Sequence, residues 1–123
     1  MATIDMTIDN FQDVIEKNSI IIIDFWASWC GPCQNFAPVF EEAAEEHTGI
    51  VFAKVNTEEQ NELAAQFQVR SIPTLAIFRD QVMVYSQPGA LPPSALDELI
   101  TQTQSLDMEK VRADIAEQQN KQA

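Results

Sequence analysis

The fold is decided by residues 20–33, which read Ile-Ile-Ile-Ile-Asp-Phe-Trp-Ala-Ser-Trp-Cys-Gly-Pro-Cys. β-Branched and aromatic side chains dominate from Ile20 to Ala27, a pattern typical of a strand buried on both faces. Such a strand lies in the middle of a sheet. The Cys-Gly-Pro-Cys segment then leads into a predicted helix that extends to about Glu46, and Pro38 is expected to kink this helix.

The rest of the chain alternates between strand-like and helix-like segments, which indicates an α/β domain. Asp9 is expected to cap a helix that carries Phe11, Val14 and Ile15 on one face. The other predicted elements are an extended start near 3–6, a strand at 50–55, a helix at 59–67, a hairpin of 75–78 and 82–85, and a helix beginning near Pro92 or Pro93.

Composition fits one globular domain and excludes several partners. The 123 residues include 19 acidic and 7 basic side chains, for a net charge of -12, and the basic residues are scattered. We therefore expect neither nucleic acid nor an anionic membrane as a partner. No apolar run approaches the roughly 20 residues of a membrane span. No basic residue precedes Lys17, so no signal peptide is visible and we expect a cytoplasmic protein.

Cys30 and Cys33 are the two cysteines of the chain, and their C-x-x-C spacing between a buried strand and a helix predicts a redox pair. The N-terminus of the helix favours a thiolate at Cys30, which is the expected nucleophile. Cys33 lies one turn later, and we expect it to be the less accessible, resolving thiol. A structural staple of four residues would contribute only about 2 kcal/mol. A zinc site is the other alternative, but two cysteines and the distant His47 provide too few ligands.

Asp24 is the second informative residue. Strand alternation places it on the same face as Ile22 and Trp26, where burial should raise the pKa of its carboxyl. Such a group near a dithiol could accept the proton of the resolving thiol as a general base. The alternative is an aspartate at a strand end that reaches water.

The segment Asp24-Phe25-Trp26-Ala27-Ser28-Trp29-Cys30-Gly31-Pro32-Cys33 closely resembles the active-site segment of the thioredoxin family. Further matches follow in family order and spacing over about residues 3–104. They are Pro38, Val51 to Asn56, Val69 to Leu75, and Gly89-Ala90-Leu91. The resemblance implies the thioredoxin fold, a central mixed five-stranded sheet with helices on both faces.

The resemblance also implies a role for individual residues. Cys30 attacks a substrate disulfide, Cys33 resolves the intermediate, and Asp24 assists with Lys54 as its charged neighbour. Ile72-Pro73 corresponds to the cis-proline loop of the family, with Gly89 and Ala90 completing the rim of the substrate groove. The implied substrate-binding residues are Trp29, Gly31, Pro32, Ile72, Pro73, Gly89 and Ala90, with Trp26 and Pro38 as structural support.

The function implied by the resemblance is a general protein-disulfide reductase without a bound cofactor or metal. Its redox group is the Cys30–Cys33 pair. A separate flavin- and NADPH-dependent thioredoxin reductase would supply electrons, and disulfide-containing client proteins would receive them. The alternatives are an oxidising or isomerising folding factor, a non-enzymatic scaffold subunit and a cluster-bridged dimer. Gly31-Pro32 between the cysteines favours the reducing function, whereas Gln34 stands where the family often has a basic residue.

The tail from about residue 106 to 123 extends beyond the usual length of the family. We expect a thioredoxin domain at 1–105 and a helical extension at 106–123. Met108, Val111 and Ile115 form a narrow apolar stripe at helical spacing. The tail is therefore expected to be either a fraying, solvated helix or a helix docked on its own domain or on a second chain. We expect a monomer, with a tail-mediated dimer as the alternative.

Overall fold

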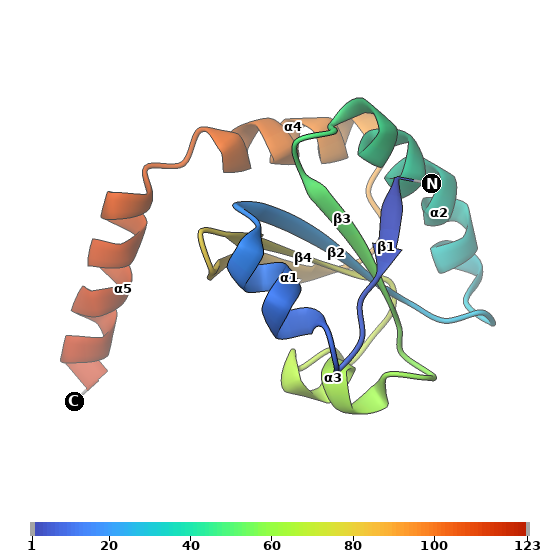
Figure 1. The fold of residues 1–123 in the computed structure, drawn as a ribbon, viewed down its shortest axis with the longest axis horizontal. Helices are drawn as coiled ribbons and strands as arrows, with labels where there is room; N and C mark the ends of the chain where they lie inside the picture. The colour runs from blue at the N-terminus through green and yellow to red at the C-terminus, as the bar shows by residue number, and fades with distance from the viewer. Residues whose placement is uncertain (1, 123) are drawn as a thin grey trace.

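The computed structural model describes residues 2–122 and has the α/β architecture that the sequence predicts (Figure 1). Five strands form one sheet, in the spatial order β1-β3-β2-β4-β5. The strands are β1 (Thr3–Asp5), β2 (Ile20–Trp26), β3 (Val51–Asn56), β4 (Thr74–Arg79) and β5 (Val82–Pro88). The helices are α1 (Phe11–Lys17), α2 (Gly31–Glu46), α3 (Asn61–Gln66), α4 (Pro93–Gln104) and α5 (Met108–Gln122).

The sheet is mixed, as the resemblance implied. β3 pairs in parallel with both β1 and β2, whereas β4 runs antiparallel to β2 and β5 antiparallel to β4. The central strand β2 is hydrogen-bonded on both edges, and residues 21–25 are fully buried. A strand in this position has little contact with water on either face, which explains why all of its residues except Asp24 are apolar.

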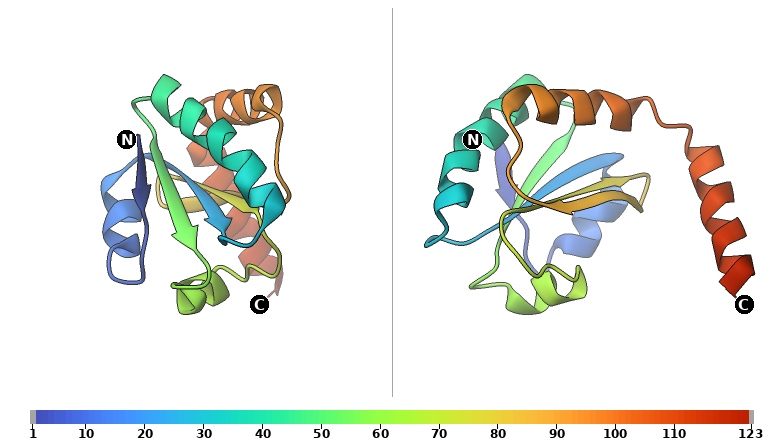
Figure 2. Two further views of the ribbon diagram at one scale, coloured as in Figure 1. Left: turned by 90° about the vertical axis from the view of Figure 1, so that its right-hand side faces the viewer. Right: turned by 180° about the vertical axis from the view of Figure 1, so that it is seen from behind.

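Helices cover both faces of the sheet and create two apolar cores (Figure 2). Ile22, Phe40 and Phe52 lie in the core with α2 and α4, together with Leu96 and Ile100 of α4. The opposite core, beneath α1 and α3, contains Ile21, Ile23, Phe25, Leu63 and Phe78. Because successive residues of β2 point to opposite faces, this one strand contributes to both cores.

The predicted cap of the first helix was wrong. α1 begins at Phe11, so Asn10 and not Asp9 is its N-cap residue. The Asn10 side chain accepts a hydrogen bond from the Thr7 amide (2.8 Å), and the Phe11 amide donates to the Thr7 carbonyl. A turn closed by Asn10 therefore precedes the helix, and Asp9 stays exposed.

The β4–β5 hairpin closes without glycine. Asp80 and Gln81 both have left-handed backbone conformations, with φ of 50° and 70°. Two-residue hairpin turns of this kind match the twist of the strands and favour Asn, Asp or Gly. Ser19 holds Asp80 in place, because its carbonyl accepts from the Asp80 amide and its hydroxyl donates to the Asp80 carboxylate.

The tail forms helix α5, which extends away from the sheet (Figure 1). Its first turn is attached to the domain: Met108 is buried, and the Arg112 guanidinium donates to the Asp80 carbonyl (3.0 Å). Arg79 secures the connection to α4 by donating to the carbonyls of Thr103 and Leu106, each at 2.8 Å. Ile115 and residues 116–121 are exposed. The start of the tail therefore docks on the domain, which is one of the two expected arrangements. The rest of the described tail is a solvated helix, which is the other.

This attachment makes a testable prediction for stability. We expect Met108→Ala to lower the free energy of unfolding by roughly 2 kcal/mol, because a buried side chain is removed. Ile115→Ala, on the same helix face but exposed, is the matched control and should change it by less than about 0.5 kcal/mol. Urea unfolding of both variants measures the difference. Equal values for the two variants would mean that the start of α5 contributes no packing.

Candidate functional site

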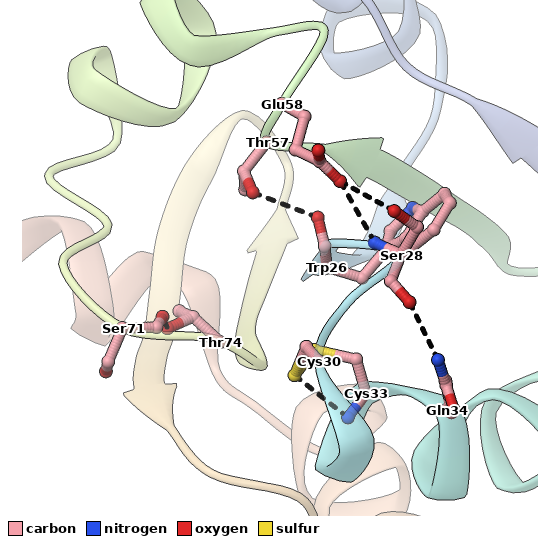
Figure 3. The surroundings of a disulfide bond; sticks show 9 residues. All are labelled: Trp26, Ser28, Cys30, Cys33, Gln34, Thr57, Glu58, Ser71 and Thr74. Atoms are coloured by element: carbon pink, nitrogen blue, oxygen red, sulfur yellow. Dashed lines mark hydrogen bonds between the residues drawn. A yellow bond between two sulfur atoms is a disulfide. The ribbon is translucent and has the colours of Figure 1, made fainter.

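The two cysteines lie where β2 passes into α2. Cys30 is the N-cap residue of α2, Cys33 lies in its first turn, and the two form a disulfide with their Cα atoms 5.2 Å apart. The Cys33 amide donates a hydrogen bond to the Cys30 sulfur (3.1 Å; Figure 3). The Cys30 sulfur therefore faces an amide that α2 leaves unpaired.

This placement determines which sulfur best carries negative charge. The first amides of a helix and its dipole stabilise an anion at the N-terminus. Cys30 occupies that position, whereas Cys33 is within the helix. This is the position that the sequence predicts for Cys30, and we expect a thiolate to be favoured there once the disulfide is reduced.

The exposure of the whole residues hardly distinguishes the two cysteines, for which we expect the Cys33 sulfur to be the less accessible. The exposed fractions are 4% for Cys30 and 3% for Cys33. Both residues pack with Ala27 and Ile72, so the loop before β4 covers the pair as a unit. The spacing of the two cysteines in the sequence could not predict that the loop carrying Ile72 covers both of them.

Asp24 lies in the middle of β2 and is 1% exposed. Neither oxygen of its carboxyl has a hydrogen-bond partner in the described part of the chain. Burial raises the pKa of this carboxyl to about 7, because the charged form loses its hydration, and the charge of Lys54 partly opposes the shift. The buried position is the one expected from strand alternation, and the alternative of an aspartate in contact with water was wrong.

Lys54 and Trp26 lie beside this carboxyl. Lys54 is the residue of β3 that pairs with Asp24 across the sheet. Its ammonium lies 5.1 Å from the centroid of the Trp26 ring, close enough for a cation–π contact. The Trp26 side chain also packs against the cysteine cluster, in agreement with its predicted supporting place.

The Ile72–Pro73 peptide bond is cis, as the resemblance implied. Next to it lies a cavity of about 420 Å³ whose lining includes both Trp29 and Ile72. Trp29 is strongly exposed to solvent, with 71% of its surface accessible. The remaining lining residues are Thr57, Ala64, Val69, Arg70 and Ser71. An exposed, largely apolar groove therefore adjoins the disulfide.

The other residues expected to bind substrate are not among those that line this groove. Gly89 has φ of 107°, and its amide donates to the Pro73 carbonyl (2.8 Å), which holds it beside the cis-proline loop. Ala90, Gly31 and Pro32 are exposed. Pro38 is an exposed residue within α2, which is assigned as one unbroken helix.

Sequence reasoning missed a set of contacts to Ser28. Its amide and hydroxyl donate to the Glu58 carboxylate, and its carbonyl accepts from the Gln34 side chain (Figure 3). Glu58 and Gln34 belong to the turn after β3 and to α2. The quoted motifs contained Ser28 but gave no signal for its partners.

Within residues 2–122, one group of acidic and histidine side chains lies close enough together to share a metal ion. Glu46, His47 and Asp97 each offer a ligand atom within 4.8 Å of the others. The group lies at the C-terminal end of α2, the opposite end from the cysteines. No helix among the described residues is long and apolar enough to cross a bilayer.

The raised pKa of Asp24 makes stability depend on pH. The folded protein binds this proton up to about pH 7, and the unfolded chain only up to its ordinary value of 3.8. Stability should therefore fall as pH rises from about 4 to about 7, by roughly 4 kcal/mol in total. We expect Asp24→Asn to remove this loss, and urea unfolding at pH 5 and pH 8 measures the part of it, roughly 3 kcal/mol, that falls between these two values. Asp9→Asn, at an exposed position, is the control; a loss in Asp24→Asn equal to that of the unmodified protein would contradict the assignment.

Comparison with known proteins agrees with this geometry. The family model described as Thioredoxin matches residues 2–120. A putative thioredoxin 2 from Streptomyces coelicolor is 52% identical over 118 residues, which are 96% of this chain and 88% of the relative. Thioredoxin 1 from Synechococcus elongatus is 45% identical over 86 residues, covering 69% of this chain and 80% of the relative.

Solved structures show the same fold. A thioredoxin mutant from Halobacterium salinarum superposes with a TM-score of 0.78 at 35% identity, covering 85% of this chain and 92% of the other. Plasmodium falciparum thioredoxin gives 0.74 at 35% identity, covering 81% and 97%. The chain therefore belongs to the thioredoxin family, and it is a thiol–disulfide oxidoreductase whose redox group is the Cys30–Cys33 pair.

Proposed function

We propose that this oxidoreductase works as a reductant of protein disulfides, with Cys30 as the attacking thiol. The observation that carries the proposal is the hydrogen bond from the Cys33 amide to the Cys30 sulfur at the start of α2. A sulfur held there is stabilised as a thiolate, which is the nucleophilic form. The apolar groove beside it provides a surface for an extended client segment.

In the first step, the Cys30 thiolate attacks one sulfur of the client disulfide. A bond forms between Cys30 and that sulfur, the client S–S bond breaks, and the second client sulfur leaves as a thiolate. The enzyme and its client are then joined by a mixed disulfide. The leaving thiolate takes a proton from solvent.

In the second step, Cys33 releases the client. Its thiol loses a proton and its sulfur attacks Cys30, which forms the intramolecular disulfide and expels the remaining client sulfur as a thiolate. Asp24 accepts the Cys33 proton, directly or through water, because a carboxyl with a pKa of about 7 exchanges protons readily at neutral pH. Lys54 stabilises the ionised form of Asp24. Two electrons have passed from the dithiol to the client.

The groove positions the client disulfide over Cys30. Trp29 and Ile72, which both line the groove, provide apolar contact for the client. Backbone groups near Pro73 bind an extended segment, a mode of recognition that reads the main chain and leaves the range of side chains broad. The exposed residues Gly31, Pro32, Gly89 and Ala90 form the outer part of this surface.

The oxidised enzyme must be reduced again after each turnover. A separate flavin-dependent thioredoxin reductase that takes electrons from NADPH fits this need, and the chain itself then requires no bound cofactor. Such a cycle belongs in a reducing compartment, the cytoplasm. The catalytic unit is a monomer comprising residues 1–105, with 106–123 as a helical extension; the C-cap of α4 at Ser105 supports this boundary.

The direction of electron flow is tested by the redox potential of the Cys30–Cys33 pair. We expect a potential more negative than that of the glutathione couple, because a reductant must hold its electrons less tightly than its clients do. Equilibration with dithiothreitol or glutathione mixtures, followed by tryptophan fluorescence, gives this value. A potential above the glutathione couple would instead indicate an oxidising folding factor.

Single substitutions test the roles of the two thiols. We expect Cys30→Ser to abolish turnover, because no thiolate remains to attack the client. Cys33→Ser should accumulate a mixed disulfide with the client through Cys30, because attack proceeds and resolution fails. Non-reducing electrophoresis and mass spectrometry identify the linked cysteine. Accumulation through Cys33 in the Cys30→Ser variant would reverse the assignment.

A further inference from the structure

Ser28, two residues before the attacking thiol, is held by side chains from two other elements (Figure 3). Glu58 accepts hydrogen bonds from its hydroxyl (2.8 Å) and its amide (3.2 Å). The Gln34 side-chain amide donates to its carbonyl (2.7 Å). All of the polar groups of Ser28 are thus engaged. We call Ser28, Gln34 and Glu58 the Ser28 clamp.

The turn that carries Glu58 is itself fixed to β2. The amide and hydroxyl of Thr57 both donate to the Trp26 carbonyl, at 2.9 and 3.0 Å. The Glu58 amide donates to the Asn56 side chain (3.0 Å). Glu58 therefore holds Ser28 from an anchored position and does not merely follow the movement of the active-site loop.

The clamp adjoins a residue with little other support. Trp29 follows Ser28 directly, has 71% of its surface exposed, and forms one side of the groove. Thr57, which precedes Glu58, lines the same groove. The clamp thus connects the loop that carries Trp29 to the turn that carries Thr57, and both of these residues line the groove.

We propose that Glu58 and Gln34 are positioning residues that hold Trp29 as a fixed wall of the groove, so that a protein client binds without first ordering this loop. The inference rests on the proposed reduction of protein disulfides. Fixing a binding surface in advance strengthens binding, because the entropy cost of ordering is removed from the binding step. The position after Cys33, where the family often has a basic residue, here carries an amide that serves this purpose.

Loss of the Ser28 clamp should weaken substrate binding more than it lowers stability. The members of the clamp are exposed, and one exposed hydrogen bond contributes little to folding. We expect Glu58→Ala and Gln34→Ala each to raise KM for a protein disulfide such as insulin by roughly three- to ten-fold, with kcat changed less than about two-fold. Reduction of a small disulfide, 5,5′-dithiobis(2-nitrobenzoic acid), should slow by less than about two-fold, because it does not span the groove.

Matched variants separate positioning from charge and from general damage. Glu58→Gln keeps an acceptor oxygen for both Ser28 donors, so it should restore KM to within about two-fold of the unmodified protein. Glu59→Ala removes the same charge one residue later, and the Glu59 carboxylate makes no hydrogen bond to Ser28; it should leave KM unchanged. The double variant Glu58→Ala with Gln34→Ala should raise KM by less than the product of the single effects, because both residues hold Ser28.

Several results would overturn the inference. They are an unchanged KM in Glu58→Ala, an equal loss with the protein and the small disulfide, and a Glu58→Gln variant as impaired as Glu58→Ala. The unmodified protein provides a separate check, because failure to reduce either disulfide counts against the proposed reductase and not against the clamp. Circular dichroism of each variant confirms that the fold is retained.

Discussion

The structure depends on the complete burial of β2. Hydrogen bonds to β3 and β4 satisfy its two edges, and the helices that cover its faces exclude water from residues 21–25. Since its side chains point alternately into the two cores, the strand fixes both helical layers at once. Its end leads through a short loop to Cys30 at the start of α2. The redox pair therefore follows directly on the fully buried central strand, a rigid kind of support for a site that needs defined geometry.

The same burial supplies the electrostatics of the site. Asp24 points to the α2–α4 side of β2 among apolar groups, where a carboxyl retains its proton to a higher pH than it would in water. Lys54, its neighbour across the sheet, limits the shift, and Trp26 covers the lysine ammonium. The fold accepts a destabilising group in its centre, and this group supports the proton transfer that we propose for the second step. Stability and reactivity are consequently linked through one carboxyl.

The sequence was sufficient for features that depend on local pattern. Continuous apolar residues predicted β2, alternation predicted the burial of Asp24, and the resemblance implied the cis bond before Pro73. Features that depend on distant contacts were not predictable in this way. Ser28 and Glu58 are 30 residues apart, and the loop at Ile72 that buries both cysteines is similarly remote. The predicted cap of α1 was wrong because Asp9 and Asn10 are equally good caps by residue type. Asn10 precedes the helix, but its side chain accepts from the Thr7 amide and caps no amide of the helix.

The direction in which α5 leaves the domain determines where a fused protein or a solid support could be attached. α5 leaves the domain on the side of the β4–β5 turn, held by Arg79 and Met108, and the end of the described chain lies on the far side from the start of α2 (Figures 1 and 2). A carrier domain, an affinity matrix or an electrode attached through the end of α5 would be separated from the disulfide by the whole sheet. The groove would then still face the solution, and the exposed part of α5 would keep the attached carrier or surface away from the domain.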